Sequence, residues 1–254
     1  MHRTRRLTLA IVCALCTAPA AGAGEHLGAA EVRAMVAAAP GRADLSGRDL
    51  SGDDLTGLDL SGARLAGSNL AGANLHGVKL VGADLQGANL SRADLTFAWF
   101  IRARFDGANL SGATLQTVIT STGMENTPDQ AASFVGANLS DANITVHFSF
   151  DDMRGANFSR ANMTVVMANQ SMGLLRTEFI ATNLDGANFS DAGLGHVTFR
   201  FAKLRHANFR GADLSDADFT GAYLNDADFT GAKTPRATFE SATMTGVKGL
   251  DHTR

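Results

Sequence analysis

The stretch that decides the fold is residues 179–209, "FIATNLDGANFSDAGLGHVTFRFAKLRHANF", in which every fifth residue is Phe or Leu. The residue two places before each of these centres is mostly Ala, and the residue one place before is mostly polar. A period of five fits neither an α-helix, which repeats every 3.6 residues, nor a strand, which repeats every two. A short period sustained over a long stretch is typical of a solenoid.

The same period covers most of the chain. It runs through residues 43–117, breaks over residues 118–132, "VITSTGMENTPDQAA", and resumes through residues 133–246. The break contains the turn residues Gly123, Asn126 and Pro128, so we expect a loop there. Register slips occur near residues 145–148 and 169–174, and a tail of residues 247–254 follows the repeat.

The order of the centres predicts the length of one coil. From Phe179 to Phe229 the centres alternate between Phe and Leu. A fifteen-residue coil would stack Phe on Leu, whereas a twenty-residue coil stacks Phe199 on Phe179. Polar positions twenty apart also alternate in charge, as vertically adjacent ion pairs should; these are Asp44, Arg64, Asp84 and Arg104. We therefore expect four-sided coils of about twenty residues, with Ala and the centre residue inside.

Units such as "ADLSG" (residues 43–47) and "ANLSG" (residues 108–112) closely resemble the pentapeptide-repeat family, whose motif is A-(D/N)-L-x-x. The resemblance extends over nearly all of residues 43–246. It implies an all-β fold, a right-handed quadrilateral parallel β-helix with one pentapeptide on each side. It also implies one functional class, since some cytoplasmic members resemble duplex DNA in shape and charge and protect or inhibit DNA gyrase.

The two ends of such a solenoid need cover, because they expose core side chains and unpaired backbone. Within residues 24–42, the segment "AAEVRAMVAAA" (residues 29–39) places Val32, Met35, Val36 and Ala39 on one helical face and stops before Pro40. We predict a short N-terminal capping helix. The tail is too short for a helix, so the C-terminal end is either lightly covered or paired with another molecule, as in a homodimer.

The first 23 residues have the pattern of a secretory signal peptide. Three arginines precede the apolar run of residues 7–16, and small residues with A-x-A spacing follow it. The apolar run is too short to span a bilayer, so we expect no stable membrane anchor. The expected location is the periplasm or the medium, with Sec and Tat export both open.

Cleavage after Ala23 changes the composition of the chain. It removes three arginines and no acidic residue, which takes the formal net charge from −3 to −6. A mildly acidic chain is a poor match for a nucleic-acid binder, so we expect no nucleic-acid partner. Cleavage also removes Cys13 and Cys16, the only cysteines, and with them any disulfide or thiolate metal site.

We predict no catalytic, cofactor-binding or metal-binding residue. No two histidines are spaced to stack in adjacent coils, which a histidine metal site on this fold would need. The best acid–base candidate is His147 with Asp151 and Asp152, but no nucleophile or cleft accompanies these residues. Asp151 occupies a normally inward position, where a local hydrogen bond in an irregular coil explains it more simply. The chain is therefore not expected to be an enzyme.

One outward surface departs from the polar pattern. In residues 92–105, "RADLTFAWFIRARF", the residues Phe97, Trp99 and Ile101 take outward positions, with Val81 one coil before Ile101. The loop of residues 118–132 follows directly. Either this loop folds over the patch and buries it, or the patch is a partner surface, as contiguous exposed apolar area often is. The first interpretation is favoured because the loop begins with two apolar residues.

Together these features predict an exported, non-enzymatic protein that acts as a rigid interaction or structural scaffold for a protein partner that the sequence does not identify. The alternative is a DNA-mimicking, gyrase-interacting protein. The signal peptide and the modest negative charge count against that alternative, since gyrase is cytoplasmic.

Overall fold

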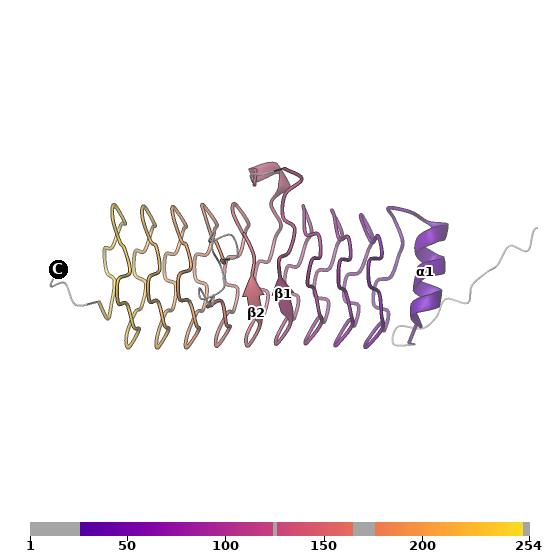
Figure 1. Cartoon of the computed structure of the whole chain (residues 1–254), viewed down its shortest axis with the longest axis horizontal. Helices are drawn as coiled ribbons and strands as arrows, with labels where there is room; N and C mark the ends of the chain where they lie inside the picture. Colours follow the sequence, from indigo (N-terminus) through magenta and orange to yellow (C-terminus); the bar gives the residue numbers. More distant parts are fainter. Residues whose placement is uncertain (1–25, 124–125, 165–175, 251–254) are drawn as a thin grey trace, which may run out of the picture.

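The computed structural model describes residues 26–123, 126–164 and 176–250. These residues wind into a rod of stacked coils, with helix α1 at the N-terminal end (Figure 1). Regular elements are few: α1 spans Ala29–Ala38, β1 Thr114–Gln116 and β2 Asn143–Thr145, and the 3-10 helix η1 spans Pro128–Gln130. In the described part of the chain, no helix has the length and apolar character needed to cross a membrane.

Parallel pairing between neighbouring coils holds the stack together. Strands β1 and β2 pair in parallel, and isolated parallel bridges join the other coils. Four successive bridge positions in the first coil each pair with the residue twenty positions later; these are Asp44, Asp49, Asp54 and Asp59. One turn of the chain therefore has four sides, and the backbone N–H and C=O groups find partners in the adjacent coils.

Leu, Phe and Ala side chains fill the bore, and most of those between Leu45 and Phe229 are fully buried. Phenylalanine rings form stacked columns in the second half of the rod. The ring centroid of Phe199 lies 5.1 Å from that of Phe179 and 4.9 Å from that of Phe219. Each buried Leu or Phe contributes roughly 1.5–3 kcal/mol, so the bore supplies most of the stability.

A ladder of amide side chains runs along the second side of the rod. In each step, Nδ2 of an asparagine donates to Oδ1 of the residue in the preceding coil, at 2.8–3.3 Å. The ladder starts at Asp49 and comprises Asn69, Asn89, Asn109, Asn138, Asn157, Asn188 and Asn208. It crosses every irregular coil, so this side keeps its register where other sides change.

The irregular coils are visible in the pairing. Arg104 pairs with Ser133 rather than with residue 124, so the loop adds nine residues to its coil. Asn138 then pairs with Asn157, which makes that coil one residue short. His147 pairs with residue 178 across the segment 165–175, which includes the whole of the second predicted slip and lies outside the described residues.

Two buried hydroxyl groups donate hydrogen bonds to backbone carbonyl groups near the short coil. Oγ1 of Thr177 donates to the carbonyl oxygen of Ile144 at 3.0 Å, and Oγ1 of Thr182 donates to that of Phe148. Both threonines are fully buried. Because an unpaired buried carbonyl is costly, Thr177 satisfies the carbonyl of Ile144, which accepts no backbone N–H among the described residues. Thr182 adds a second bond to the carbonyl of Phe148, which also accepts from the N–H of Asp151 at 3.4 Å.

The two ends of the rod differ. Val32 and Val36 of α1 are buried and Met35 packs partly against the core, while Arg33 donates to the carbonyl oxygen of Asp54 at 3.0 Å. At the other end, pairing extends to Lys248, whose N–H donates to the carbonyl oxygen of Ala227 at 3.0 Å. The predicted signal peptide, residues 1–23, lies outside the described residues.

Candidate interaction surface

The predicted patch centres on Phe97 and Trp99. Phe97 stands at a corner of the coil and is 45% exposed. Trp99 is half-buried on the adjoining side, between Lys79 of the preceding coil and Ile119 of the following coil. Val81 is also half-buried. The exposed apolar surface at this place is therefore mainly aromatic.

Ile101 does not belong to an exposed patch, because it is only 1% exposed. The reason lies in the returning end of the loop. The N–H of Arg102 donates to the carbonyl oxygen of Gln130 at 3.0 Å, which places Gln130 above Ile101 in the following coil. Ile101 is not part of the core cluster and is buried where the loop returns, so the burial expected for the patch applies to this residue.

The loop begins later than the sequence indicates. Val118 is buried in the core, and the N–H of Ile119 donates to the carbonyl oxygen of Ala98 at 2.8 Å, so both residues belong to the coil. The segment that carries η1 projects from the rod (Figure 1). Nδ2 of Asn126 donates to the carbonyl oxygen of His147 at 3.0 Å, in the following coil. The loop leans away from Phe97, so the expectation that it buries the patch is wrong for this residue.

Basic groups surround the two aromatic rings. Nζ of Lys79 lies 5.7 Å from the centroid of the Trp99 ring and 3.9 Å from Oδ2 of Asp59. The His76 ring meets Phe97 edge-on, with centroids 5.3 Å apart. A cation over an exposed aromatic ring contributes about 0.5–1 kcal/mol, so Lys79 helps to orient Trp99.

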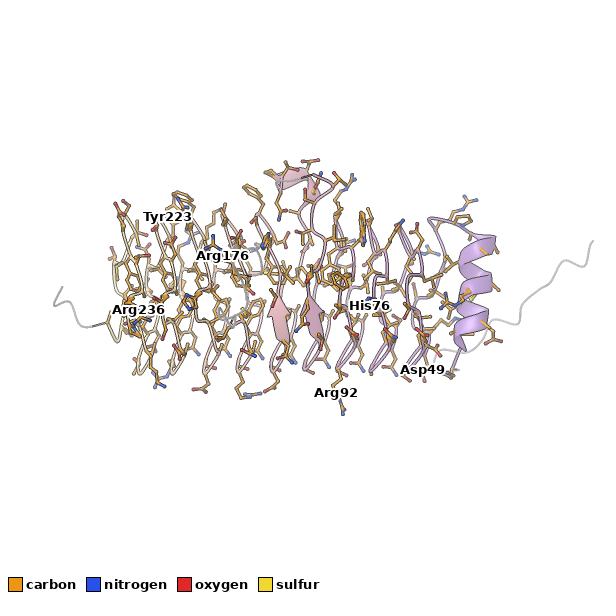
Figure 2. All side chains as sticks on the ribbon, in the orientation of Figure 1. Asp49, His76, Arg92, Arg176, Tyr223 and Arg236 are labelled. Carbon is orange, nitrogen blue, oxygen red and sulfur yellow. The ribbon has the colours of Figure 1, made fainter. Side chains whose placement is uncertain are left out.

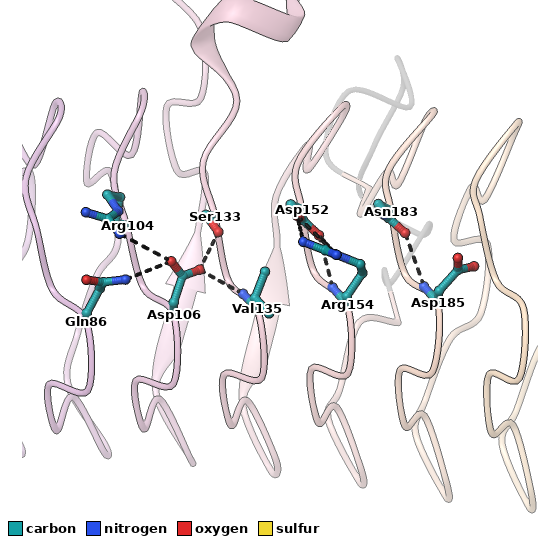
Figure 3. Close-up of polar contacts among 9 residues, drawn as sticks. All are labelled: Gln86, Arg104, Asp106, Ser133, Val135, Asp152, Arg154, Asn183 and Asp185. Atoms are coloured by element: carbon teal, nitrogen blue, oxygen red, sulfur yellow. Dashed lines mark hydrogen bonds and ion pairs between the residues drawn. The ribbon is translucent and has the colours of Figure 1, made fainter.

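Two carboxylates hold the return of the loop from opposite directions. Asp106, in the preceding coil, accepts hydrogen bonds from Oγ of Ser133 and from the N–H of Val135, the latter at 3.0 Å (Figure 3). Asp151, in the following coil, accepts one from the N–H of Ala132 at 2.7 Å. The loop is therefore clamped at the point where it rejoins the stack.

The residues of the acid–base candidate do not converge. Asp151 is buried, and burial raises the pKa of this carboxyl to about 8, while its Oδ2 has no hydrogen-bond partner in the described part of the chain. Asp152 is held by Arg154, with Nη2 and Oδ2 2.7 Å apart, and His147 is exposed. Across residues 26–123, 126–164 and 176–250, no three His, Cys, Asp or Glu side chains are grouped to hold a metal ion.

Sequence reasoning misses three further exposed aromatic residues: Phe150, Phe201 and Tyr223. The signal that finds Phe97 could have found the first two. Each takes a corner position with positive φ, 69° for Phe150 and 58° for Phe201, where the regular coils have glycine. A large apolar residue in place of this glycine is unusual, so Phe150 and Phe201 are candidate surface residues on the same grounds as Phe97.

Two family models match the chain. The model described as pentapeptide repeats (8 copies) matches residues 41–77, 49–87 and 88–116. The model described as pentapeptide repeat region matches residues 172–248. Together they cover more than half of the chain. No curated protein matches the sequence.

Several solved structures resemble the chain. HetL, a pentapeptide repeat protein involved in heterocyst differentiation regulation from Nostoc sp. strain PCC 7120, is 26% identical; the match covers 87% of this chain and 97% of HetL, with a TM-score of 0.35. Trypsin-treated QnrB1, a plasmid-mediated fluoroquinolone resistance protein, is 19% identical over 82% of this chain and 90% of that one, with a TM-score of 0.47. A pentapeptide repeat protein of the Arabidopsis thaliana thylakoid lumen is 30% identical over 51% and 70%, with a TM-score of 0.28.

The five-residue period, the parallel pairing of coils and the two family models agree. The chain belongs to the pentapeptide-repeat family, whose members fold as right-handed quadrilateral β-helices.

Proposed function

We propose that this protein is exported and acts, without catalysis, as a rigid scaffold that binds a protein partner through the surface around Phe97 and Trp99. The observation that carries the proposal is the exposure of Phe97, an apolar ring at a corner where regular coils have glycine. Its φ is 60°, in the left-handed region, where a side chain costs roughly 1–2 kcal/mol relative to the usual backbone. Since Phe97 is also exposed, folding gains little from it, and binding accounts for its presence.

Site-specific photo-crosslinking tests this assignment. A photoreactive phenylalanine analogue replaces Phe97 in one variant and Arg92 in a control. Arg92 has a similar φ of 58° and projects from the edge of the rod away from the loop (Figure 2). We expect a discrete crosslinked species in intact cells from position 97 only. Equal crosslinking from both positions, or none from either, would contradict the proposal.

Export rests on the pattern of residues 1–23. The expected result is a mature protein whose intact mass lacks these residues and which fractionates with the periplasm or the medium. A full-length protein in the cytosol would overturn export and would favour the gyrase-interacting alternative.

The charges of the rod give that alternative little support. A DNA mimic needs a continuous negative surface, whereas here acidic groups are paired with basic groups of adjacent coils. Asp44 pairs with Arg64, and Asp84 lies 3.9 Å from Arg104. Such exposed pairs add little stability, but they divide the negative potential along the rod.

The two ends of the stack suggest two different roles. We propose that α1 caps the twenty-residue coils at the N-terminal end, since it buries two valines there. At the other end, Phe239 and Met244 are only partly buried, and no carbonyl among the described residues accepts their N–H groups. This end is suited to pairing with a second copy in a homodimer. Sedimentation velocity of the wild type and of Phe239→Asp tests this. We expect the wild type to sediment as a dimer and Phe239→Asp as a monomer. A monomeric wild type would contradict the homodimer.

A further inference from the structure

A second set of exposed aromatic residues lies along one corner of the rod. The N–H of Phe150 donates to the carbonyl oxygen of Ile180, and the N–H of Ala181 donates to that of Arg200. These bonds place Phe150, Ala181 and Phe201 in successive coils at the same corner. Tyr223 follows one coil later on the adjoining side, paired with Lys203. We name Phe150, Phe201 and Tyr223 the aromatic strip; Tyr223 lies toward the C-terminal end of the rod (Figure 2).

Folding does not explain the aromatic strip. Phe150, Phe201 and Tyr223 are 36%, 51% and 47% exposed, so they add little to the core. Phe150 and Phe201 have left-handed backbones, which glycine adopts at no steric cost. Glycine does occupy this corner at Gly82 and Gly221. The two phenylalanines are therefore retained at a cost to stability.

The Phe201 ring lies against the next coil. A Cβ atom added to Gly221 would come within 2.5 Å of Cδ1 and 2.6 Å of Cε1 of Phe201, so one edge of the ring contacts this glycine. Phe201 is 51% exposed, so much of its surface remains open to solvent. On its other side along the corner stands Ala181, whose small side chain leaves room between the two phenylalanines.

Basic groups accompany these rings. The Arg200 guanidinium lies 5.7 Å from the centroid of the Phe201 ring. Lys203 is exposed and has no ion-pair partner among the described residues. The carboxylate beside them, Asp218, is already bonded to the hydroxyl and N–H groups of Thr220 and lies 3.8 Å from Arg200. Glu240, also exposed, lies two coils beyond Arg200.

We propose that the aromatic strip binds a linear acidic polysaccharide that lies along the axis of the rod. The C–H faces of sugar rings pack on flat, exposed aromatic rings. Phe150 and Phe201 are two coils apart, a separation of about 10 Å at the spacing of parallel strands. This matches the repeat of a β-1,4-linked disaccharide, so alternate sugars would meet the two rings. Arg200 and Lys203 supply the donors for the carboxylates of the ligand.

Calorimetric titration with a hexamer of β-1,4-linked mannuronic acid tests the proposal. The key variant is Phe201→Gly, because it restores the usual residue of this corner. It should melt at the wild-type temperature or higher, yet bind the hexamer at least tenfold more weakly. The matched control is Phe97→Gly, which makes the same change at another corner and should leave hexamer binding unchanged.

The proposed role of the basic groups is tested by a second comparison, between an acidic and a neutral sugar. Lys203→Gln should weaken binding of the acidic hexamer at least threefold, and neutral cellohexaose should bind the wild type at least tenfold more weakly than the acidic hexamer. The proposal would be overturned if neither sugar bound the wild type, or if Phe97→Gly lost as much affinity for the hexamer as Phe201→Gly. If the two sugars bound the wild type equally well, the assignment of an acidic ligand would be wrong. These sugar-binding results do not decide whether Phe97 binds a protein partner, since that proposal depends on different residues.

Discussion

Asp151 offers a quantitative test of how the core tolerates an ionisable group. Asp151→Asn keeps the size of the side chain and an oxygen for the N–H of Ala132, but removes the titration. Burial raises the pKa of Asp151 from 3.8 to about 8. The folded protein therefore holds a proton at neutral pH that the unfolded chain releases.

The size of the effect follows from this difference. One pKa unit corresponds to 1.36 kcal/mol, so at pH 7 the retained proton costs the wild type on the order of 4 kcal/mol of stability. At pH 4 the unfolded carboxyl is about 40% protonated and the cost falls to about 0.6 kcal/mol, and it disappears at lower pH. The raised pKa means that stability is complete at low pH and is lost as the pH rises toward about 8. Asp151→Asn should thus gain an advantage over the wild type that grows from near zero to about 4 kcal/mol.

Urea unfolding followed by circular dichroism between pH 4 and pH 8 measures this advantage. A suitable control is Asp141→Asn, because a hydrogen bond from Arg160 lowers the pKa of Asp141. This group stays ionised in both states above pH 5, so its variant should differ from the wild type by a constant amount. If the difference between Asp151→Asn and the wild type does not change with pH, Asp151 is not a buried, protonated carboxyl.

Two further predictions concern the bore and the amide ladder. Leu85→Asp places a carboxylate among fully buried side chains and should cost several kcal/mol of unfolding free energy. Asp84→Ser, on the outside, should cost under about 1 kcal/mol, and equal losses of melting temperature would refute the inward and outward assignments. Asn138→Ala removes two ladder bonds and the acceptor of the Ser140 N–H, so we expect a loss of about 1–3 kcal/mol in urea unfolding. The exposed Asn143→Ala should change stability by less than about 0.5 kcal/mol, and a similar loss in both variants would show that the ladder adds nothing.

The regular coils could be predicted from the sequence because the period itself contains the geometry. Alternating Phe and Leu centres identify which rings share a column, and the Phe199 and Phe219 rings do stack. The one-residue register slip could also be predicted from the sequence, since the five-residue repeat changes phase there. The hydrogen bonds from Thr177 and Thr182 to the carbonyls of Ile144 and Phe148 could not be predicted, because they depend on how the irregular coils meet in three dimensions.

The candidate surface was harder to predict for a physical reason. Phe97, Trp99 and Ile101 all take outward positions in the repeat, yet Phe97 is 45% exposed, Trp99 is half-buried and Ile101 is buried. Whether an outward side chain reaches solvent depends on the coil that follows it, and here that coil contains the loop. The sequence does not specify that the loop rejoins above Ile101 and leans toward His147.

The most direct test of the whole account is an engineered disulfide in a chain that lacks residues 1–23 and therefore all cysteines. Asn74 and Asp94 are twenty residues apart and bridged in adjacent coils, within the distance that a disulfide spans. Cysteines at these two positions should form a disulfide under mild oxidation, seen as a loss of two mass units and a raised melting temperature. Cysteines at Lys79 and Asp94, fifteen residues apart, should remain reduced. A disulfide in the second pair but not in the first would contradict four-sided coils and the surface assignments that depend on them.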